Sequence, residues 1–388
     1  MPVFALETEQ EEWAGRLRAL AVDRLRPLAE KGEPGRVNRP LLAALGELGL
    51  LERLFGSGAL ELCLMRESLA YGCTEAETAL ALQGLGAHPV LTAGSAAQRE
   101  RWLPGVRQGT VVAAFALSEP GAGSDAAALA LRAEPDGGGW LLTGEKRWIS
   151  NAPEADFYTV FARTGEAAGA RGVTAFLVPA DRPGLTGERL DMLSPHPIGS
   201  LVFDRVPVGH GDLLGEPGRG FAVAMETLNL FRPSVGAFAV GMARAALDAA
   251  LAHTARREAF GGVLGDLQAV AHRIAEMATR TEAARLLVYA AAGAYDRGSP
   301  EVPRRAAMAK LLATETAQYV VDHAVQLHGA HALQRGHLLE HLYREVRAPR
   351  IYEGASEVQR TVIARELYRA AGAAGAEAAG AAATEVAR

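Results

Sequence analysis

The middle of this 388-residue chain reads VVAAFAL (111–117), GWLLTGEKRWIS (139–150), FYTVFAR (157–163), GVTAFLVPA (172–180) and SLVFDRVPV (200–208). These stretches are short, rich in β-branched and aromatic residues, and separated by Gly, Pro and Asp, which is typical of strands joined by turns. The gaps between them are too short for the crossover helices that parallel strands need. The sequence therefore predicts a mostly antiparallel β-barrel or β-sandwich here.

Both flanks of this β-rich middle are predicted to be helical. Before it, leucines recur at a spacing of three and four residues, and Ser95 is placed to cap a helix. After it, long Ala-rich segments contain few β-branched residues. The expected fold is therefore α+β, with an N-terminal helical domain (1–112), a central β domain (113–222), a C-terminal helical bundle (223–368) and an Ala/Gly-rich tail (369–388) that either frays or forms a marginal helix.

Composition excludes several classes of function. The net charge of −5 offers no general attraction to nucleic acid or to an acidic membrane surface. Cys63 and Cys73 are too few for a disulfide framework or a cysteine-based zinc site. The N-terminus lacks the basic and apolar regions of a signal peptide, and no segment has the roughly 20 uninterrupted apolar residues of a membrane span. We therefore expect a cytoplasmic protein without nucleic-acid or membrane partners.

Two motifs suggest cofactor or metal binding. FALSEPGAGSD (115–125) places two glycines beside small hydroxyls, a combination that can hold a phosphate or a ring carbonyl. It also fits a dinucleotide fingerprint, but the next turn follows too soon for the crossover helix of that fold. HLLEH (337–341) fits a metallopeptidase pattern that places His337 and His341 on one helix face. A short match of this kind is more often a solvated or interface helix face, so no metal is expected.

A third motif, IYEGASEVQR (351–360), places Glu353 among apolar residues just before an expected helix. A carboxylate at that position either caps the helix or acts as a base with a perturbed pKa. The residues alone leave both roles open.

Together, these motifs and their order resemble the acyl-CoA dehydrogenase family over nearly the whole chain, to about residue 368. The resemblance is carried by FALSEPGAGSD (115–125), GEKRWISNA (144–152), GEPGRGF (215–221) with RREAFGGVLGDLQ (256–268), QLHGA (326–330) and LYREVRAPRIYEGASEVQR (342–360). It implies FAD as cofactor, an acyl-CoA or acyl-carrier-protein thioester as substrate, and an electron-transfer flavoprotein as acceptor. It also implies a homotetramer, a dimer of dimers, in which part of the cofactor contacts a neighbouring subunit.

The resemblance assigns the site residues by position. For the cofactor it implies contacts from Phe115, Leu117, Ser118, Gly123, Ser124, Trp148, Ile149, Ser150, Arg257, Phe260, Gln268, Gln326, Gly329, Ala355 and Glu357. Trp148 and Ser150 correspond to the pair beside the flavin ring, whereas Gln326 and Gly329 correspond to contacts supplied across the dimer. For the substrate it implies Ser124, Arg232 and Gly354.

Glu353 is, by the same resemblance, the base that takes the α proton. Burial would strengthen it as a base. Some members carry this carboxylate on the helix that contains Arg232, but here the nearest acid, Glu226, is expected to face elsewhere. The segments LLERLFGSGALELC (50–63) and SPHPIGSLVF (194–203) depart from the family pattern and predict an atypical acyl group. A flavin oxidase or monooxygenase of the same fold is the alternative function.

Overall fold

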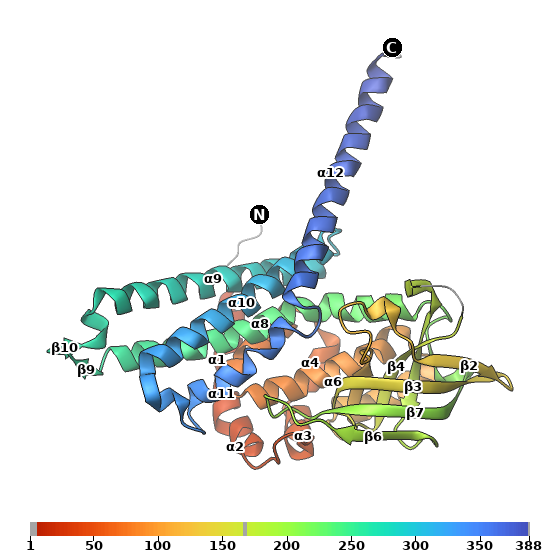
Figure 1. Cartoon of the computed structure of the whole chain (residues 1–388), viewed down its shortest axis with the longest axis horizontal. Coiled ribbons are helices and arrows are strands. Elements are labelled where there is room, and N and C mark those ends of the chain that lie inside the picture. The colour runs from red at the N-terminus through yellow and green to blue at the C-terminus, as the bar shows by residue number, and fades with distance from the viewer. Residues whose placement is uncertain (1–5, 166–168, 387–388) are drawn as a thin grey trace.

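The structure is a computed structural model that describes residues 6–165 and 169–386, with side chains described as far as residue 372. Helices at the two ends of the chain pack together, and one sheet lies against an end of the helical part (Figure 1). This arrangement confirms the predicted α+β class and the order of helices, strands and helices. The last two residues of the predicted tail lie outside the described residues, while residues 369–386 continue helix α12.

The N-terminal helices form where apolar stripes and capping residues predict them. Leu41, Leu42 and Leu45 are all buried. Ser95 caps the last helix of this group as predicted, since its hydroxyl accepts a hydrogen bond of 3.2 Å from the main-chain N–H of Gln98. The group comprises α1 (Thr8–Leu20), a π-helical turn (Ala21–Leu25), α2 (Arg26–Ala29), α3 (Arg39–Glu47), α4 (Leu50–Gly56), α5 (Ala59–Gly72), α6 (Thr74–Ala93) and α7 (Ala96–Arg107).

Eight of the described strands form one sheet in the order β6-β7-β3-β2-β4-β5-β8, with β1 pairing to β4. Most pairs are antiparallel, as predicted, but β1 and β2 both run parallel to β4. Strands β6 and β8 end the order without pairing to each other, so the described strands form no closed barrel. The strands are β1 (Ala113–Ala116), β2 (Arg132–Asp136), β3 (Gly139–Ser150), β4 (Phe157–Arg163), β5 (Val173–Pro179), β6 (Leu185–Arg189), β7 (Ile198–Gly209) and β8 (Leu213–Leu214).

The C-terminal part is built around one long, largely buried helix, α8 (Gly220–Thr254). This helix is apolar and long enough to cross a membrane, but 67% of its most apolar window is buried inside the structure, as in the core helix of a globular protein. The others are α9 (Gln268–Asp296), α10 (Val302–His328), α11 (Leu338–Glu345) and α12 (Ser356–Val386), and a short hairpin, β9 (Glu258–Ala259) with β10 (Gly262–Val263), joins α8 to α9.

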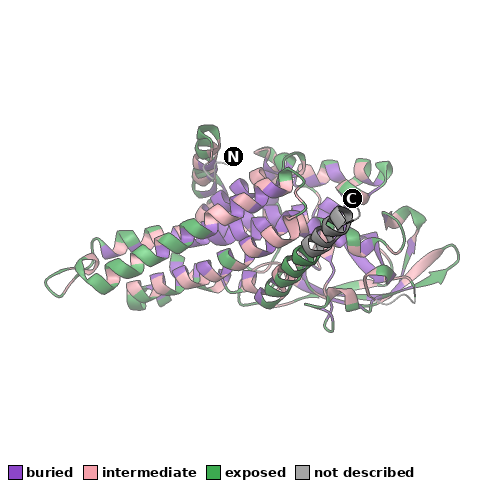
Figure 2. Ribbon diagram, turned by 90° about the horizontal axis from the view of Figure 1, so that it is seen from above, coloured by how far each residue is buried: buried purple, intermediate pink, exposed green. Residues whose placement is uncertain are grey.

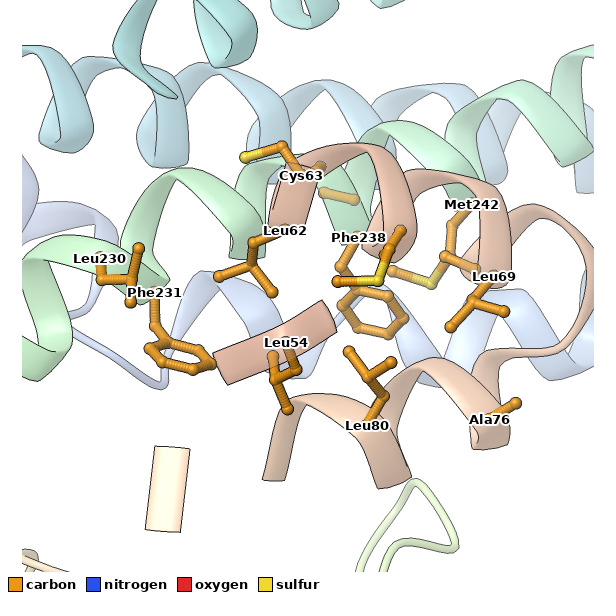
Figure 3. Packing of buried hydrophobic residues seen from close by; sticks show 14 of the residues in the cluster. Leu54, Leu62, Cys63, Leu69, Ala76, Leu80, Leu230, Phe231, Phe238 and Met242 are labelled. Atoms are coloured by element: carbon orange, nitrogen blue, oxygen red, sulfur yellow. The ribbon is translucent and has the colours of Figure 1, made fainter. Parts of the chain in front are cut away.

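The core joins the two helical groups. Figure 2 shows buried segments concentrated where the helices meet and exposed segments on their outer faces. Phe238 and Met242 of α8 lie among Leu62 and Leu69 of α5 and Leu80 of α6 (Figure 3). Nearby, a Cβ at Gly241 would lie 2.3 Å from the main-chain oxygen of Glu67, so glycine allows α8 to approach α5 closely. Helices α5, α6 and α8 therefore pack closely against one another.

Candidate active site

Glu353 occupies a turn between a 3₁₀ segment (Ala348–Arg350) and helix α12. Its φ of 51° is in the left-handed region, and Gly354 follows with a φ of 95°. Such backbone is costly for a residue other than glycine and persists only where the surroundings hold it. The amide of Gln359 donates hydrogen bonds to the main-chain oxygens of Glu353 and Gly354 at 3.2 and 2.8 Å. Lys310 Nζ also donates to Gly354 O, at 2.6 Å, and Arg232 Nε donates to Glu353 O, at 3.4 Å.

One oxygen of the Glu353 carboxylate is not used as an acceptor by the residues that the structure describes. This atom, Oε2, is buried and has no hydrogen-bond partner among them. Burial raises the pKa of Glu353, while the positive charges of Arg66, Arg232 and Lys310 act in the opposite direction. A half-buried carboxylate with one buried, unpartnered oxygen and a raised pKa is suited to accept a proton from a bound molecule.

Glu226, the other acid weighed for this role, is exposed on α8. That it faces away from the site stays a prediction.

The glycine-rich loop between β1 and β2 is held in place by a buried ion pair. Lys146 of β3 donates to Glu119 Oε1 at 2.7 Å and to the main-chain oxygen of Leu117 at 2.9 Å. The Glu119 carboxylate also accepts the main-chain N–H groups of Ala130 and Leu131, at 2.6 and 2.9 Å. Burial lowers the pKa of Lys146 to about 8, and the adjacent Glu119 opposes this shift. The loop that contains Ser118, Gly123 and Ser124 is thus fastened at both ends.

Two of the segments assigned to the flavin lie side by side. The main-chain N–H of Arg147 donates to the main-chain oxygen of Ser118 at 3.0 Å, which brings Trp148 next to the glycine-rich loop. Trp148 has a φ of 57°, and 46% of its surface is exposed despite its size. A Cβ at Gly123 would have no heavy atom within 4 Å, so the loop presents open backbone. Exposed indole, free backbone and small hydroxyls fit a flavin ring and its phosphates.

The neighbouring assigned residues differ in accessibility. Ile149 and Leu117 are buried, and Ser150 is half-buried at the end of β3. The ring of Phe115 packs against Phe161, with centroids 4.9 Å apart. Phe115, Leu117 and Ile149 therefore pack in the core and not on the open surface of the loop and strand. At the start of α12, Ala355 is half-buried and Glu357 is exposed.

The remaining assigned residues are not brought to this loop within one chain. Arg257, Phe260 and Gln268 lie at and beside the β9–β10 hairpin, at the end of the helical part opposite the sheet (Figure 1). Gln326 and Gly329, at the end of α10, belong to the same end, since the nearby His253 and His328 rings stack at 4.2 Å. Phe260 is 90% exposed. These residues form a second, separate surface.

The zinc hypothesis has no support from the partners of its residues. His337 caps α11, its Nδ1 accepting the main-chain N–H of Leu339 at 3.1 Å. His341 Nε2 lies 2.6 Å from the hydroxyl of Thr74, and Glu340 pairs with Arg344. Within residues 6–165 and 169–386, no group of three or more His, Cys, Asp or Glu side chains is arranged to hold a metal ion.

Several charged residues around Glu353 were not predicted from the sequence. Arg66 and Glu77, a buried ion pair, come from α5 and α6, and Lys310 comes from α10. The signal in the sequence was that these charged residues lie among apolar residues in segments predicted to be helical. Which charges would meet depends on how the helices pack, and the sequence does not give that packing.

Comparison with known proteins agrees with this architecture. Models of the acyl-CoA dehydrogenase N-terminal, middle and C-terminal domains match residues 7–110, 114–206 and 218–368. The chain is 40% identical over 336 residues to the mitochondrial short-chain specific acyl-CoA dehydrogenase of Bos taurus, a match that covers 84% of this chain and 81% of the relative.

Solved structures are similar over nearly the whole chain. Butyryl-CoA dehydrogenase from Megasphaera elsdenii has a TM-score of 0.87 and 32% identity, with 94% of this chain and 100% of that chain covered. The FAD complex of PigA has a TM-score of 0.88 and 28% identity, with 94% and 99% covered. The chain therefore belongs to the acyl-CoA dehydrogenase family of FAD-dependent oxidoreductases.

Proposed function

We propose that this enzyme introduces a double bond between the α and β carbons of a short or branched acyl-CoA thioester, with Glu353 taking the α proton. The observation that carries the proposal is the half-buried Glu353 side chain in a strained turn, whose buried Oε2 atom is free of any partner among the described residues. The names of two similar proteins, a short-chain specific enzyme and a butyryl-CoA dehydrogenase, favour a short acyl group.

The geometry supplies what proton abstraction needs. A C–H group beside a thioester carbonyl is a weak acid, so its base must be poorly solvated and close to the substrate. Burial raises the pKa of Glu353 and so strengthens it as a base. The main-chain N–H of Glu353 has no acceptor in the described part of the chain and can donate to the thioester oxygen. That hydrogen bond would stabilise the negative charge that develops there.

The glycine-rich loop (118–125) and strand β3 would hold the cofactor. When bound, FAD supplies the acceptor for the hydride that leaves the β carbon. Ser118 and Ser124 offer hydroxyls, the backbone around Gly123 is open, and Trp148 offers an exposed aromatic face. Residues of β3 and the loop would orient the ring, and Arg232, whose Nε donates to the main-chain oxygen of Glu353, would contact the substrate.

A second copy of the chain would complete the cofactor site. Arg257, Phe260 and Gln268, assigned to the pyrophosphate and adenosine part, lie at the far end of the same chain from the loop (Figure 1). A homo-oligomer, a dimer of dimers in the fullest form, would bring this end of one subunit to the loop of another. An electron-transfer flavoprotein as acceptor and a cytoplasmic location remain predictions.

The alternatives are a carrier-protein substrate and an oxygen-using enzyme of the same fold. A base for α-proton removal has no necessary role in oxygen insertion, so the unpartnered Glu353 favours dehydrogenation. The test is anaerobic titration of the FAD-loaded protein with a panel of acyl-CoA thioesters, followed by visible absorbance. We expect the flavin bands to bleach with a short or branched member. Protein that binds FAD but bleaches with no thioester, and consumes oxygen instead, would contradict the proposal.

A further inference from the structure

A buried ion pair joins the helices that pack around the turn that carries Glu353. Arg66 of α5 and Glu77 of α6 are 3% and 0% exposed, and the Nε of Arg66 donates to Glu77 Oε1. Arg66 Nη1 donates a second hydrogen bond, of 2.7 Å, to the hydroxyl of Ser234 on α8. The guanidinium carbon also lies 5.8 Å from the centre of the Phe238 ring. The guanidinium is therefore held by three helices.

Such a pair is poorly explained by stability alone. Removing two charges from water costs about as much as their attraction returns, and well-packed apolar residues often replace a buried pair without loss. The surroundings here are the apolar core of α5, α6 and α8, which needs no charge to pack. We therefore expect a neighbouring group on which the charge of Arg66 acts.

Glu353 is that neighbour. Ser234, which accepts from Arg66, is two residues from Arg232 on α8. Arg232 Nε donates to the main-chain oxygen of Glu353 at 3.4 Å. Helix α8 thus joins Arg66 to the Glu353 turn, and the charge of Arg66 favours the ionised carboxylate. Oε2 of Glu353 nevertheless has no hydrogen-bond partner among the described residues. The guanidinium is directed to Glu77 and Ser234 instead. It acts on the carboxylate through space and leaves that oxygen free.

We propose that Arg66 is a positioning residue for the reaction: Glu77 and Ser234 hold its guanidinium on the Glu353 side of α8, yet prevent it from pairing with the carboxylate. This inference rests on the proposed role of Glu353 as the base. A free guanidinium would form a salt bridge with Glu353 and weaken it as a base, whereas its removal would favour the protonated carboxyl group.

Other charges also surround the base and must stay unchanged in the test. Arg232 and Lys310 are committed to the main-chain oxygens of Glu353 and Gly354. Tyr352, in the same turn, interacts with Arg66. His196, which pairs with Glu345 at 2.6 Å, also acts on the charge of Glu77.

The variants Arg66→Met and Glu77→Gln separate this role from a structural one because they act in opposite directions. Arg66→Met removes the favourable charge, so the protonation midpoint of Glu353 moves to higher pH. Glu77→Gln removes a negative charge and releases the guanidinium, so the midpoint moves to lower pH. The double variant should lie between the two. A purely structural pair would give the same kind of defect in both variants.

The midpoint is read in two ways. In the resting protein, the infrared band of the protonated Glu353 carboxyl, assigned by its loss in Glu353→Gln, is titrated without substrate. In the FAD-loaded enzyme, the rate of flavin reduction is followed against pH. Arg66→Met should be slow at neutral pH and recover at high pH, whereas Glu77→Gln should reach a lower plateau at every pH above its midpoint.

Ser234→Ala is a milder variant that tests the inference if the charge variants do not fold, since it removes only one hydroxyl that holds the guanidinium. Its midpoint should move in the direction of Glu77→Gln. Midpoints that stay at the wild-type value, or that move the same way in Arg66→Met and Glu77→Gln, overturn the inference even if Glu353→Gln abolishes flavin reduction. Full flavin reduction by Glu353→Gln would instead overturn the proposed function itself.

Discussion

The ammonium group of Lys146 lies 2.7 Å from a carboxylate oxygen of Glu119, and this buried ion pair ties strand β3 to the glycine-rich loop. Since the same carboxylate accepts two main-chain N–H groups at the far end of the loop, one interaction fixes both walls of the proposed flavin site.

Replacing Lys146 by Met should therefore weaken FAD binding and lower stability together. It leaves the Glu119 carboxylate, 5% exposed, without its counter-charge, a change that costs about 3–5 kcal/mol. The free energy of unfolding of the apoprotein and the Kd for FAD, from quenching of flavin fluorescence, measure the two effects. Exposed Lys31→Met is the matched control and should change neither. Unaltered FAD affinity in Lys146→Met would show that the ion pair does not organise the loop.

A second ion pair predicts a pH window for stability. Burial alone would lower the pKa of His196 and raise that of Glu345, but each stabilises the charged form of the other, so that the pKa of His196 rises and that of Glu345 falls to about 2. The Glu345 contribution is present above its ordinary value of 4.5 and is lost as the pH falls toward 2. The His196 contribution is present below its ordinary value of 6.5 and is lost as the pH rises through the folded pKa.

The pair should therefore stabilise the protein most between about pH 4.5 and 6.5. His196→Gln leaves Glu345 buried without a cation and should cost about 3–5 kcal/mol in that window. Urea unfolding at several pH values measures the difference, with exposed His272→Gln as the control. A loss that is the same at every pH would mean that the histidine contributes by packing and not by charge.

Glu353 itself should destabilise the folded protein at neutral pH. Its pKa is raised by burial, so the folded state binds this proton more tightly than the unfolded chain does. The resulting stabilisation is present below the ordinary pKa of a glutamate and is lost as the pH rises through the folded value. Glu353→Gln cannot ionise, so the variant apoprotein should melt at a higher temperature than the wild type near neutrality. The difference should shrink on acidification; a variant that melts lower at neutral pH contradicts the raised pKa.

The sequence predicted the features that depend on neighbouring residues. The Ser95 cap, the order of helices and strands, and the position of Glu353 just before a helix all follow from local pattern. The parallel pairing of β1 with β4 joins residues more than forty positions apart, and such pairing is set by the packed sheet.

The segment around His196 departs from the family pattern, and the sequence shows this. The partner of His196, Glu345, lies 149 residues away, so the sequence did not predict the pair. Likewise, Arg66 and Glu77 lie on separate helices, and whether they form an ion pair depends on how α5 and α6 pack. Sequence pattern marks such charges as unexpected in an apolar stripe, whereas only the fold shows which groups they face.

The most direct test of the account is anaerobic flavin reduction by Glu353→Gln with the thioester that bleaches the wild type. Glutamine keeps the size of the side chain but cannot accept the α proton, so FAD should stay bound while the reduction rate falls by at least about 100-fold. Glu52 is exposed and pairs with Arg107 at 3.5 Å, so Glu52→Gln should reduce its flavin at the wild-type rate. Reduction of Glu353→Gln at that same rate would contradict the assignment of Glu353 as the base.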